Sequence, residues 1–179
     1  MNKPLKEKKC KECSNKFTPQ RPLQYLCSIE CSIKDARKKQ AKKEKKADKV
    51  VKDKLMTKGE WLNLAQKVFN SWIRLRDKDN FCISCDTPMQ GRKGDASHFY
   101  PTTYTYLRFN PDNVHLSCVT CNQFKHGNLQ EYRPRLINKI GLKRVEYLDN
   151  CRHLKLEMDI NDIKELIKLY KLKIKELQK

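Results

Sequence analysis

Glycine, aromatic residues and long apolar runs are all scarce in this chain of 179 residues. It has five glycines, and 8% of its residues are aromatic. No apolar run reaches the roughly 18 residues of a membrane-spanning helix, and the first residues, MNKPLKEKKC, contain no secretory leader, so we expect no membrane contact. Only 38% of the residues are hydrophobic, cysteines included. The apolar core must therefore be small, and metal ligation is expected to supply folding energy that burial cannot.

Acidic residues are outnumbered almost two to one. The chain has 21 Asp and Glu against 40 Lys and Arg, a formal net charge of +19. This excess favours a polyanionic partner, with nucleic acid as the first candidate. Part of it lies in residues 32–58, where the stretch from 34 to 58 has twelve Lys or Arg and four Asp or Glu. Good helix formers dominate there, which predicts a basic helix, capped by Ser28 or Ser32, or a solvated linker.

Nine cysteines without a leader indicate a reducing compartment, so we expect a cytoplasmic protein with metal sites rather than disulfides. Eight of them form four close pairs, and Cys151 is left alone as a packed residue. The first two pairs predict an N-terminal zinc module, residues 1–31, with the ligands Cys10, Cys13, Cys27 and Cys31. Its small core is expected to contain Phe17, Leu23 and Tyr25. The two CxxC pairs further on predict a second structural Zn²⁺ site at Cys82, Cys85, Cys118 and Cys121.

Three further segments have helical patterns. Residues 59–77 carry an apolar stripe at helical spacing, which we expect to pack on the second metal unit: Trp61, Leu64, Ala65, Val68, Trp72 and Leu75. Residues 129–148 predict two short helices separated by Gly141, with Pro134 in a first turn. Residues 159–179 predict one amphipathic helix, capped by Asp159 or Asn161, that packs on its own chain or pairs with a second copy.

Between and just after the CxxC pairs lies a set of polar residues suited to phosphodiester chemistry. His98 is placed on a short strand, and a neutral imidazole is the usual general base near pH 7. Asp95 precedes it by three residues, on the opposite side of the strand. Asn122 and His126, at i and i+4, are expected to share the face of a helix that begins near Cys118. Carboxylate and amide oxygens suit Mg²⁺ or Mn²⁺, which would polarise a phosphodiester.

The order of these residues resembles that of the HNH, or ββα-metal, nucleases. The resemblance rests on paired Cys, an acidic residue, His, Asn, paired Cys and a following Asn. It implies that His98 is the general base, that Asn113 braces the loop which orients it, and that Asn122 binds the catalytic metal from the helix. Ser97 stands where many of these enzymes have Asp or His, so Asp95 becomes the substitute ligand, with His126 as a further one.

A narrower resemblance spans nearly the whole chain. The segments CISC, LRFN, NVH and CVTCNQFKHGNL, together with the N-terminal four-Cys module, are similar to the lambdoid phage NinG (Rap) recombination proteins. This resemblance implies structure-specific cleavage of branched DNA, such as Holliday junctions and D-loops, during phage recombination in the host cytoplasm.

The sequence therefore predicts an α+β protein with a small zinc-stapled, HNH-like core. We expect four parts, at 1–31, 32–58, 59–150 and 151–179, of which the third is the nuclease domain. The alternative is a non-catalytic zinc-containing DNA-binding accessory or regulatory protein, which explains the charge and the cysteines equally well. Symmetric cutting of a junction needs two active sites, so we expect a homodimer, with residues 151–179 as the candidate interface.

Overall fold

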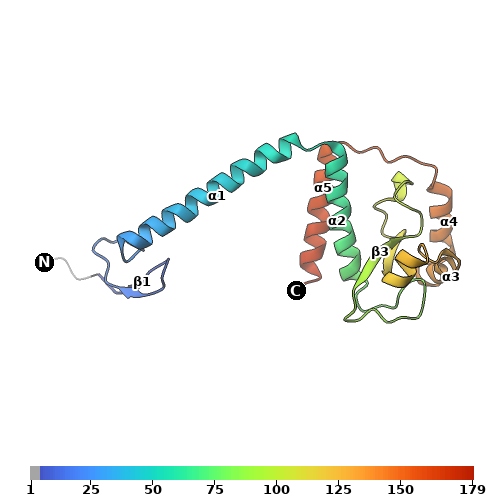
Figure 1. Ribbon diagram of the computed structural model, residues 1–179, viewed down its shortest axis with the longest axis horizontal. Coiled ribbons are helices and arrows are strands. Elements are labelled where there is room, and N and C mark those ends of the chain that lie inside the picture. The colour runs from blue at the N-terminus through green and yellow to red at the C-terminus, as the bar shows by residue number, and fades with distance from the viewer. Residues whose placement is uncertain (1–4) are drawn as a thin grey trace. The chain divides into compact units, whose positions relative to one another are not determined.

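The computed structural model describes residues 5–179, and the chain divides into two compact units between Met56 and Thr57 (Figure 1). The fold is α+β, with two small antiparallel hairpins among helices, as expected. The finer division into four parts stays a prediction. Within residues 5–179, no helix is both long enough and apolar enough to cross a membrane.

The first unit consists of a hairpin and one long helix. Strand β1 (Lys8–Lys9) pairs with β2 (Lys16–Phe17), and helix α1 runs over Ile29–Leu55. The cap of α1 is Ser28, whose hydroxyl accepts the backbone N–H of Cys31 at 3.2 Å. Cys31 thus lies in the first turn of α1, so this helix begins before the last predicted zinc ligand.

The expected apolar core of the N-terminal module is wrong for two of its three members. Phe17 is half-buried, but Leu23 is 88% exposed and Tyr25 is 49% exposed. The buried positions are instead Cys10, Pro19 and Cys31. The reason is physical: four sulfur atoms occupy the centre of a unit this small, and they leave no room for an aromatic ring.

The second unit begins with α2 (Lys58–Arg76). Thr57 and Glu60 form a capping box at its start, in which each side chain bonds the other's backbone N–H. The buried face is Trp61, Ala65, Phe69, Trp72 and Ile73. The predicted stripe was correct for both tryptophans and Ala65, but Leu64, Val68 and Leu75 are only half-buried. Phe69 and Ile73, which the predicted stripe did not include, are buried instead. The buried face of α2 is therefore turned toward these two residues.

Helix α5 (Ile160–Glu176) packs against α2 within the chain (Figure 1). Its cap is Asp159, in a capping box with Asp162. The Tyr170 ring meets Phe69 and Trp72 with centroids 4.9 Å apart in both pairs. Ile163, Ile167 and Tyr170 are buried by this contact. The main apolar face of α5 is therefore buried against its own chain. A homodimer through residues 151–179 stays a prediction, and its interface would have to use another face of the helix.

A two-stranded hairpin holds the central residues of the second unit. Strand β3 (Gly94–His98) pairs with β4 (Val114–Cys118), with Gly94 opposite Cys118 and His98 opposite Val114. A Cβ on Gly94 would overlap Met89 Cε and lie 2.8 Å from the carbonyl oxygen of Ser117. Only glycine therefore fits where β3 crosses the zinc knuckle. The short helix η1 (Thr105–Leu107) lies in the loop between the strands, and η2 (Thr120–Phe124), a single wide π-turn, follows β4.

Helices α3 (Leu129–Ile140) and α4 (Leu142–Cys151) complete the unit and are separated by Gly141 at φ +87°, as predicted. Pro134 is not in a first turn: it lies inside α3, because the helix begins five residues earlier, at Leu129. The two helices share one apolar cluster with the zinc knuckle before β3 and the loop between β3 and β4, and Cys151 packs against it: Ile83, Phe99, Leu107, Tyr132, Leu136, Val145 and Leu148.

Candidate active site and metal centres

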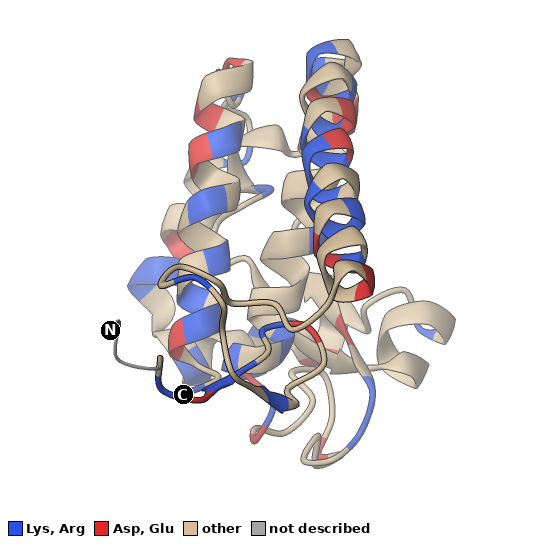
Figure 2. Cartoon of the chain, turned by 90° about the vertical axis from the view of Figure 1, so that its left-hand side faces the viewer, with Lys and Arg blue, Asp and Glu red and all other residues tan. Residues whose placement is uncertain are grey.

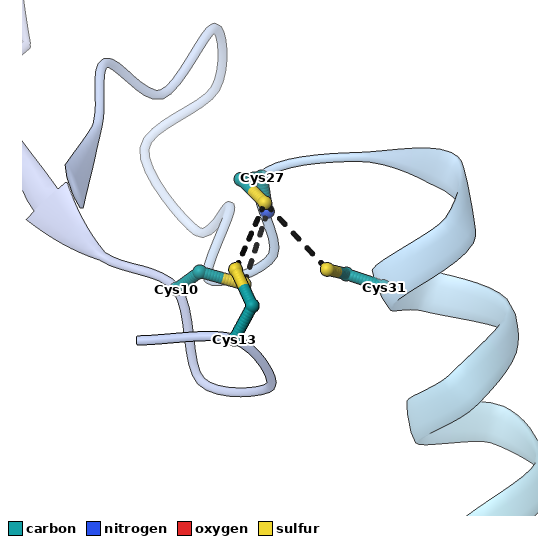
Figure 3. A group of neighbouring side chains, drawn as sticks. All are labelled: Cys10, Cys13, Cys27 and Cys31. Carbon is teal, nitrogen blue, oxygen red and sulfur yellow. Dashed lines mark hydrogen bonds between the residues drawn. The ribbon is translucent and has the colours of Figure 1, made fainter. Parts of the chain in front are cut away.

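The four N-terminal cysteines converge on one point (Figure 3). Their sulfur atoms all lie within 4.8 Å of one another, with Cys13 to Cys27 at 3.5 Å and Cys27 to Cys31 at 3.6 Å. The backbone N–H of Cys27 donates to the Cys10 sulfur at 3.4 Å. Hydrogen bonds of this kind favour thiolate, and the backbone amide of Cys13 is the largest of the influences that lower the pKa of the Cys10 thiol to about 6.

The second group joins two segments more than 30 residues apart in sequence. Cys82 and Cys85 come from the knuckle before β3, and Cys118 and Cys121 from the end of β4 and from η2. Cys85 and Cys118 sulfurs are 3.9 Å apart. Backbone amides again point at the ligands, from Cys118 to the Cys82 sulfur at 3.2 Å and from Cys121 to the Cys118 sulfur at 3.4 Å.

Both groups fit a tetrahedral zinc ion. Zn–S bonds of about 2.3 Å place the sulfurs of a tetrahedral site about 3.8 Å apart, close to the separations found here. Four thiolates with no nearby open position are typical of structural zinc. The two predicted four-Cys clusters are thus confirmed as clusters, and the residues present suit Zn²⁺ in both.

His98 is half-buried at the end of β3. Its Nε2 lies 3.1 Å from the carbonyl oxygen of Arg108 and donates to it, since a carbonyl only accepts. In the neutral ring the lone pair is therefore on Nδ1. Burial lowers the pKa of His98, although the carbonyls of Arg108 and Ala96 act in the opposite direction. The ring is accordingly neutral at pH 7, the form that a general base needs.

Asn113 is fully buried and ties the loop between β3 and β4 together. Its Oδ1 accepts the backbone N–H of Tyr100 at 2.7 Å, and its Nδ2 donates to the carbonyls of Tyr100 at 2.9 Å and Leu107 at 3.0 Å. Arg108, whose carbonyl holds His98, follows directly after Leu107. The side chain of Arg108 is itself fixed to α2 through Gln66 at 2.8 Å. Asn113 is thereby placed to fix the loop that orients His98.

Asp95 and Asn122, separated by 27 residues, are brought together by the hairpin and η2. Asn122 Nδ2 donates to Asp95 Oδ2 at 3.0 Å, and Gln123 Nε2 donates to the same oxygen at 2.8 Å. Gln123 was not predicted from the sequence. No direct contact joins His98 to this pair within the described residues, and both Asp95 and His98 lie on β3, three residues apart. The Asp95 carboxylate and the Asn122 amide oxygen are ligands of the kind that a hard divalent cation takes, but here Asn122 turns its Nδ2 and not its oxygen toward Asp95.

His126 does not share a helix face with Asn122, contrary to expectation. The π-turn ends at Phe124, and His126, Gly127 and Asn128 all have positive φ. The N–H of Gly127 bonds back to the Cys121 carbonyl at 2.9 Å, and Ser84 donates to the Gly127 carbonyl at 2.8 Å. This turn locks the chain onto the zinc knuckle after one helical turn. His126 is left exposed, without a contact to Asp95 or Asn122 within residues 5–179.

A buried ionic cluster beside the hairpin was missed altogether. Asp77, 2% exposed, accepts two hydrogen bonds from Arg76 and lies 3.5 Å from the Lys139 ammonium. Burial alone would raise the pKa of Asp77, but the contact with His115, whose Nδ1 lies 3.5 Å away, together with Arg76 and Lys139 holds it well below its usual range. His115 Nε2 donates to the Asp112 carbonyl, and its Nδ1 lies 3.0 Å from Arg76, a donor, so the ring is neutral and structural. The cluster fastens α2 and α3 to β4.

Comparison with known proteins identifies the family. The sequence model described as "Bacteriophage Lambda NinG protein" matches residues 2–179. The chain belongs to the NinG family of lambdoid phages. It is 36% identical to protein ninG of Escherichia phage lambda, over 99% of this chain and 96% of that protein. It is also 34% identical to protein ninG of Escherichia phage 933W, over 99% of this chain and 96% of that protein. It is 34% identical to protein ninG of Salmonella phage P22, over 96% of this chain and 94% of that protein. No solved structure matches it.

Membership of the NinG family covers both units of the chain, the N-terminal four-Cys cluster as well as the hairpin. The geometry described above is therefore that of a NinG protein along its whole length, and the chemistry of its hairpin has to be argued from the side chains.

Proposed function

We propose that this NinG-family chain is a metal-dependent endonuclease that cuts branched DNA, such as Holliday junctions and D-loops, in phage recombination. The observation that carries the proposal is the placement of His98, whose ring is held through Nε2 by a backbone carbonyl. The loop that supplies this carbonyl is braced by the buried Asn113. The same strand presents Asp95 beside Asn122. The order and the zinc knuckles are similar to those of HNH nucleases.

The proposed reaction uses the lone pair on Nδ1 of His98. It takes a proton from a water molecule, and the resulting hydroxide attacks the phosphorus while the bond to the leaving oxygen breaks. Asn113 contributes by positioning, because its hydrogen bonds keep Leu107 and the following carbonyl of Arg108 in place. When bound by Asp95 and Asn122, Mg²⁺ or Mn²⁺ supplies charge stabilisation to the phosphodiester and the leaving oxygen.

The test is cleavage of a labelled four-way junction beside a linear duplex of matching sequence, with Mg²⁺, with Mn²⁺ and with no added divalent ion. The zinc-loaded protein is compared with His98→Ala and with His153→Ala, a histidine that is exposed and outside the proposed site. We expect metal-dependent cutting of the junction by the parent and by His153→Ala, and none by His98→Ala. Tight binding without cutting under any metal would leave the second candidate, a non-catalytic DNA-binding protein.

The DNA partner is supported by one face of α1. Lys and Arg, blue in Figure 2, recur along this helix. At 100° per residue, five lysines without an ion pair in the described chain fall within an arc of about 80° and span about 27 Å: Lys34, Lys42, Lys45, Lys49 and Lys52. A sixth, Lys38, shares the arc but is paired with Glu12. No acidic residue of α1 falls in the arc, so this lysine stripe offers an uninterrupted row of cations to phosphates.

The lysine stripe can be tested against a control of equal charge. Changing four of its lysines to Gln (Lys34, Lys42, Lys45 and Lys49) is compared with changing four basic residues on the rest of α1: Arg37, Lys43, Lys46 and Lys54. If each of these four stripe lysines meets a phosphate, the slope of log K against log salt for duplex binding becomes about 3.6 less steep. The control variant is expected to change the slope far less. Equal slopes for the two variants would show that net charge, and not the stripe, binds the DNA.

A further inference from the structure

The N-terminal unit exposes an aromatic ring beside an open hollow. The hollow has a volume of about 440 Å³ and lies against the start of α1. Its lining combines the Tyr25 ring with polar side chains and the exposed Ile29: Gln20, Gln24, Tyr25, Leu26, Cys27, Ser28, Ile29 and Ser32. Tyr25 is 49% exposed and Ile29 is 80% exposed. Neither side chain packs in the interior of the N-terminal unit, where the four cysteine sulfurs lie.

Two cations stand over the same ring. The ammonium groups of Lys11 and Lys39 each lie 5.7 Å from the centroid of the Tyr25 ring. Lys11 lies in the turn between β1 and β2, and Lys39 lies on α1, so the fold places them from separate elements. Lys39 also pairs with Asp35 at 2.7 Å. Both side chains are long and exposed, and their ammonium groups can turn from the ring toward an anion beside it.

The segment that leads into α1 is positive, and both of its acidic residues are paired with lysines; Glu30 follows in the first turn of α1. Between residues 5 and 28 the chain has two acidic residues, Glu7 and Glu12. Glu7 lies 3.7 Å from Lys16, and Glu12 is paired with Lys38. The remaining basic residues of this segment are left to face a partner: Lys6, Lys8, Lys9, Lys11 and Arg21. A half-exposed aromatic ring within such a field matches a nucleotide more closely than it matches an apolar peptide.

We propose that this hollow, the Tyr25 hollow, binds an unpaired nucleotide of branched DNA. The base stacks on the Tyr25 ring, Lys11 and Lys39 meet the phosphates on either side of it, and the Gln and Ser side chains face the edge of the base. Stacking on an aromatic ring is available to any base that is not inside a duplex, so the site distinguishes a branch point from a paired arm. The proposal extends the proposed function by naming what recognises the branch.

The test uses binding alone, so it does not depend on cleavage. A fluorescent oligothymidylate and a hairpin duplex are titrated, without divalent ions, into the parent, Tyr25→Leu and Tyr25→Phe. Tyr147→Leu is the matched control, because Tyr147 is also 49% exposed but lies on α4. We expect Tyr25→Leu to weaken oligothymidylate binding roughly 5- to 100-fold, with duplex binding unchanged. Tyr25→Phe and Tyr147→Leu should behave as the parent.

A second measurement keeps the proposal testable if Tyr25→Leu loses its zinc. The parent protein is irradiated with an oligomer containing 5-iodouracil, and the crosslinked peptide is expected to contain Tyr25. Crosslinks confined to other peptides, or an equal loss of single-strand and duplex binding in Tyr25→Leu, would overturn the proposal. Tighter binding of the matching RNA oligomer would overturn the assignment to DNA. Because both measurements report binding without divalent ions, their outcome is separate from that of the proposed chemistry at His98.

Discussion

Replacing Asn113 with Ala tests whether one buried amide holds the loop that orients His98. The change removes three hydrogen bonds, at 2.7, 2.9 and 3.0 Å, and leaves the N–H and the carbonyl of Tyr100 without partners among the described residues, while the Leu107 carbonyl keeps the N–H of Asn110 at 3.1 Å. Each orphaned buried group costs about 1–3 kcal/mol, and partial relaxation of the loop offsets some of this. We therefore expect the free energy of unfolding to fall by about 3–5 kcal/mol, measured by urea denaturation.

Asn110→Ala is the matched control, because Asn110 lies in the same loop and gives up a single hydrogen bond, to the N–H of Asp112 at 2.9 Å. Its loss is expected to be about 0.5–1.5 kcal/mol. In Asn113→Ala the loosened loop should also admit water to His98, so that its pKa, followed by NMR, rises toward the usual 6.5. Equal stability losses in the two variants, with an unmoved His98 pKa, would refute the bracing role.

Three further predictions concern zinc, a glycine and pH. Cys13→Ser should remove one of two zinc equivalents and leave the thermal unfolding of residues 57–179 intact. Cys121→Ser should remove the other zinc equivalent and abolish that unfolding transition. Metal analysis measures the zinc content of both variants, and calorimetry measures their unfolding. Gly94→Ala should lower the free energy of unfolding by about 1–3 kcal/mol, because its Cβ would lie 2.8 Å from the Ser117 carbonyl. Gly59→Ala, with nothing nearer than 3.9 Å, should be neutral or slightly stabilising in the same denaturation assay. Because burial lowers the pKa of His98, its neutral ring contributes stability above the unfolded pKa of about 6.5, and this is lost as pH falls through the lower folded pKa. Cleavage should then persist somewhat below pH 6.5. If the cleavage rate falls to half at a pH above 6.5 as the pH is lowered, the assigned state of His98 is contradicted.

Local signals in the sequence predicted local structure well. Ser28 and Asp159 cap helices as expected, because a cap depends on residues only three positions away. Gly141 separates α3 from α4 for the same reason, since it supplies a positive φ. The cysteine spacing predicted both clusters, because each close pair can present two sulfurs to one ion.

Features that depend on distant residues escaped prediction. The bonds from Arg76 to Val114 and His115 join positions 38 and 39 residues apart, and no periodicity reports such a contact. The end of η2 was misplaced because a contact with Ser84 locks the turn at Gly127. Tyr25 was expected inside its module because aromatic rings usually are, but four sulfurs fill that interior.

The candidate site was predictable in its order but not in its contacts. His98, Asn113 and Asn122 were chosen by their positions between and after the CxxC pairs. The sequence did not show that Gln123 joins Asn122 at Asp95, or that the carbonyl of Arg108 fixes His98. The latter is a backbone contact, which residue identity does not encode.

The contact of α5 with α2 has a consequence for the order in which the protein can fold. Phe69 and Tyr170 are 101 positions apart, and the ring of one covers the ring of the other. While the chain is being synthesised, the apolar face of α2 leaves the ribosome long before α5 exists to cover it. The second unit therefore cannot finish folding on a partial chain, and Trp61, Phe69 and Trp72 stay available to chaperones or to aggregation until α5 has been synthesised.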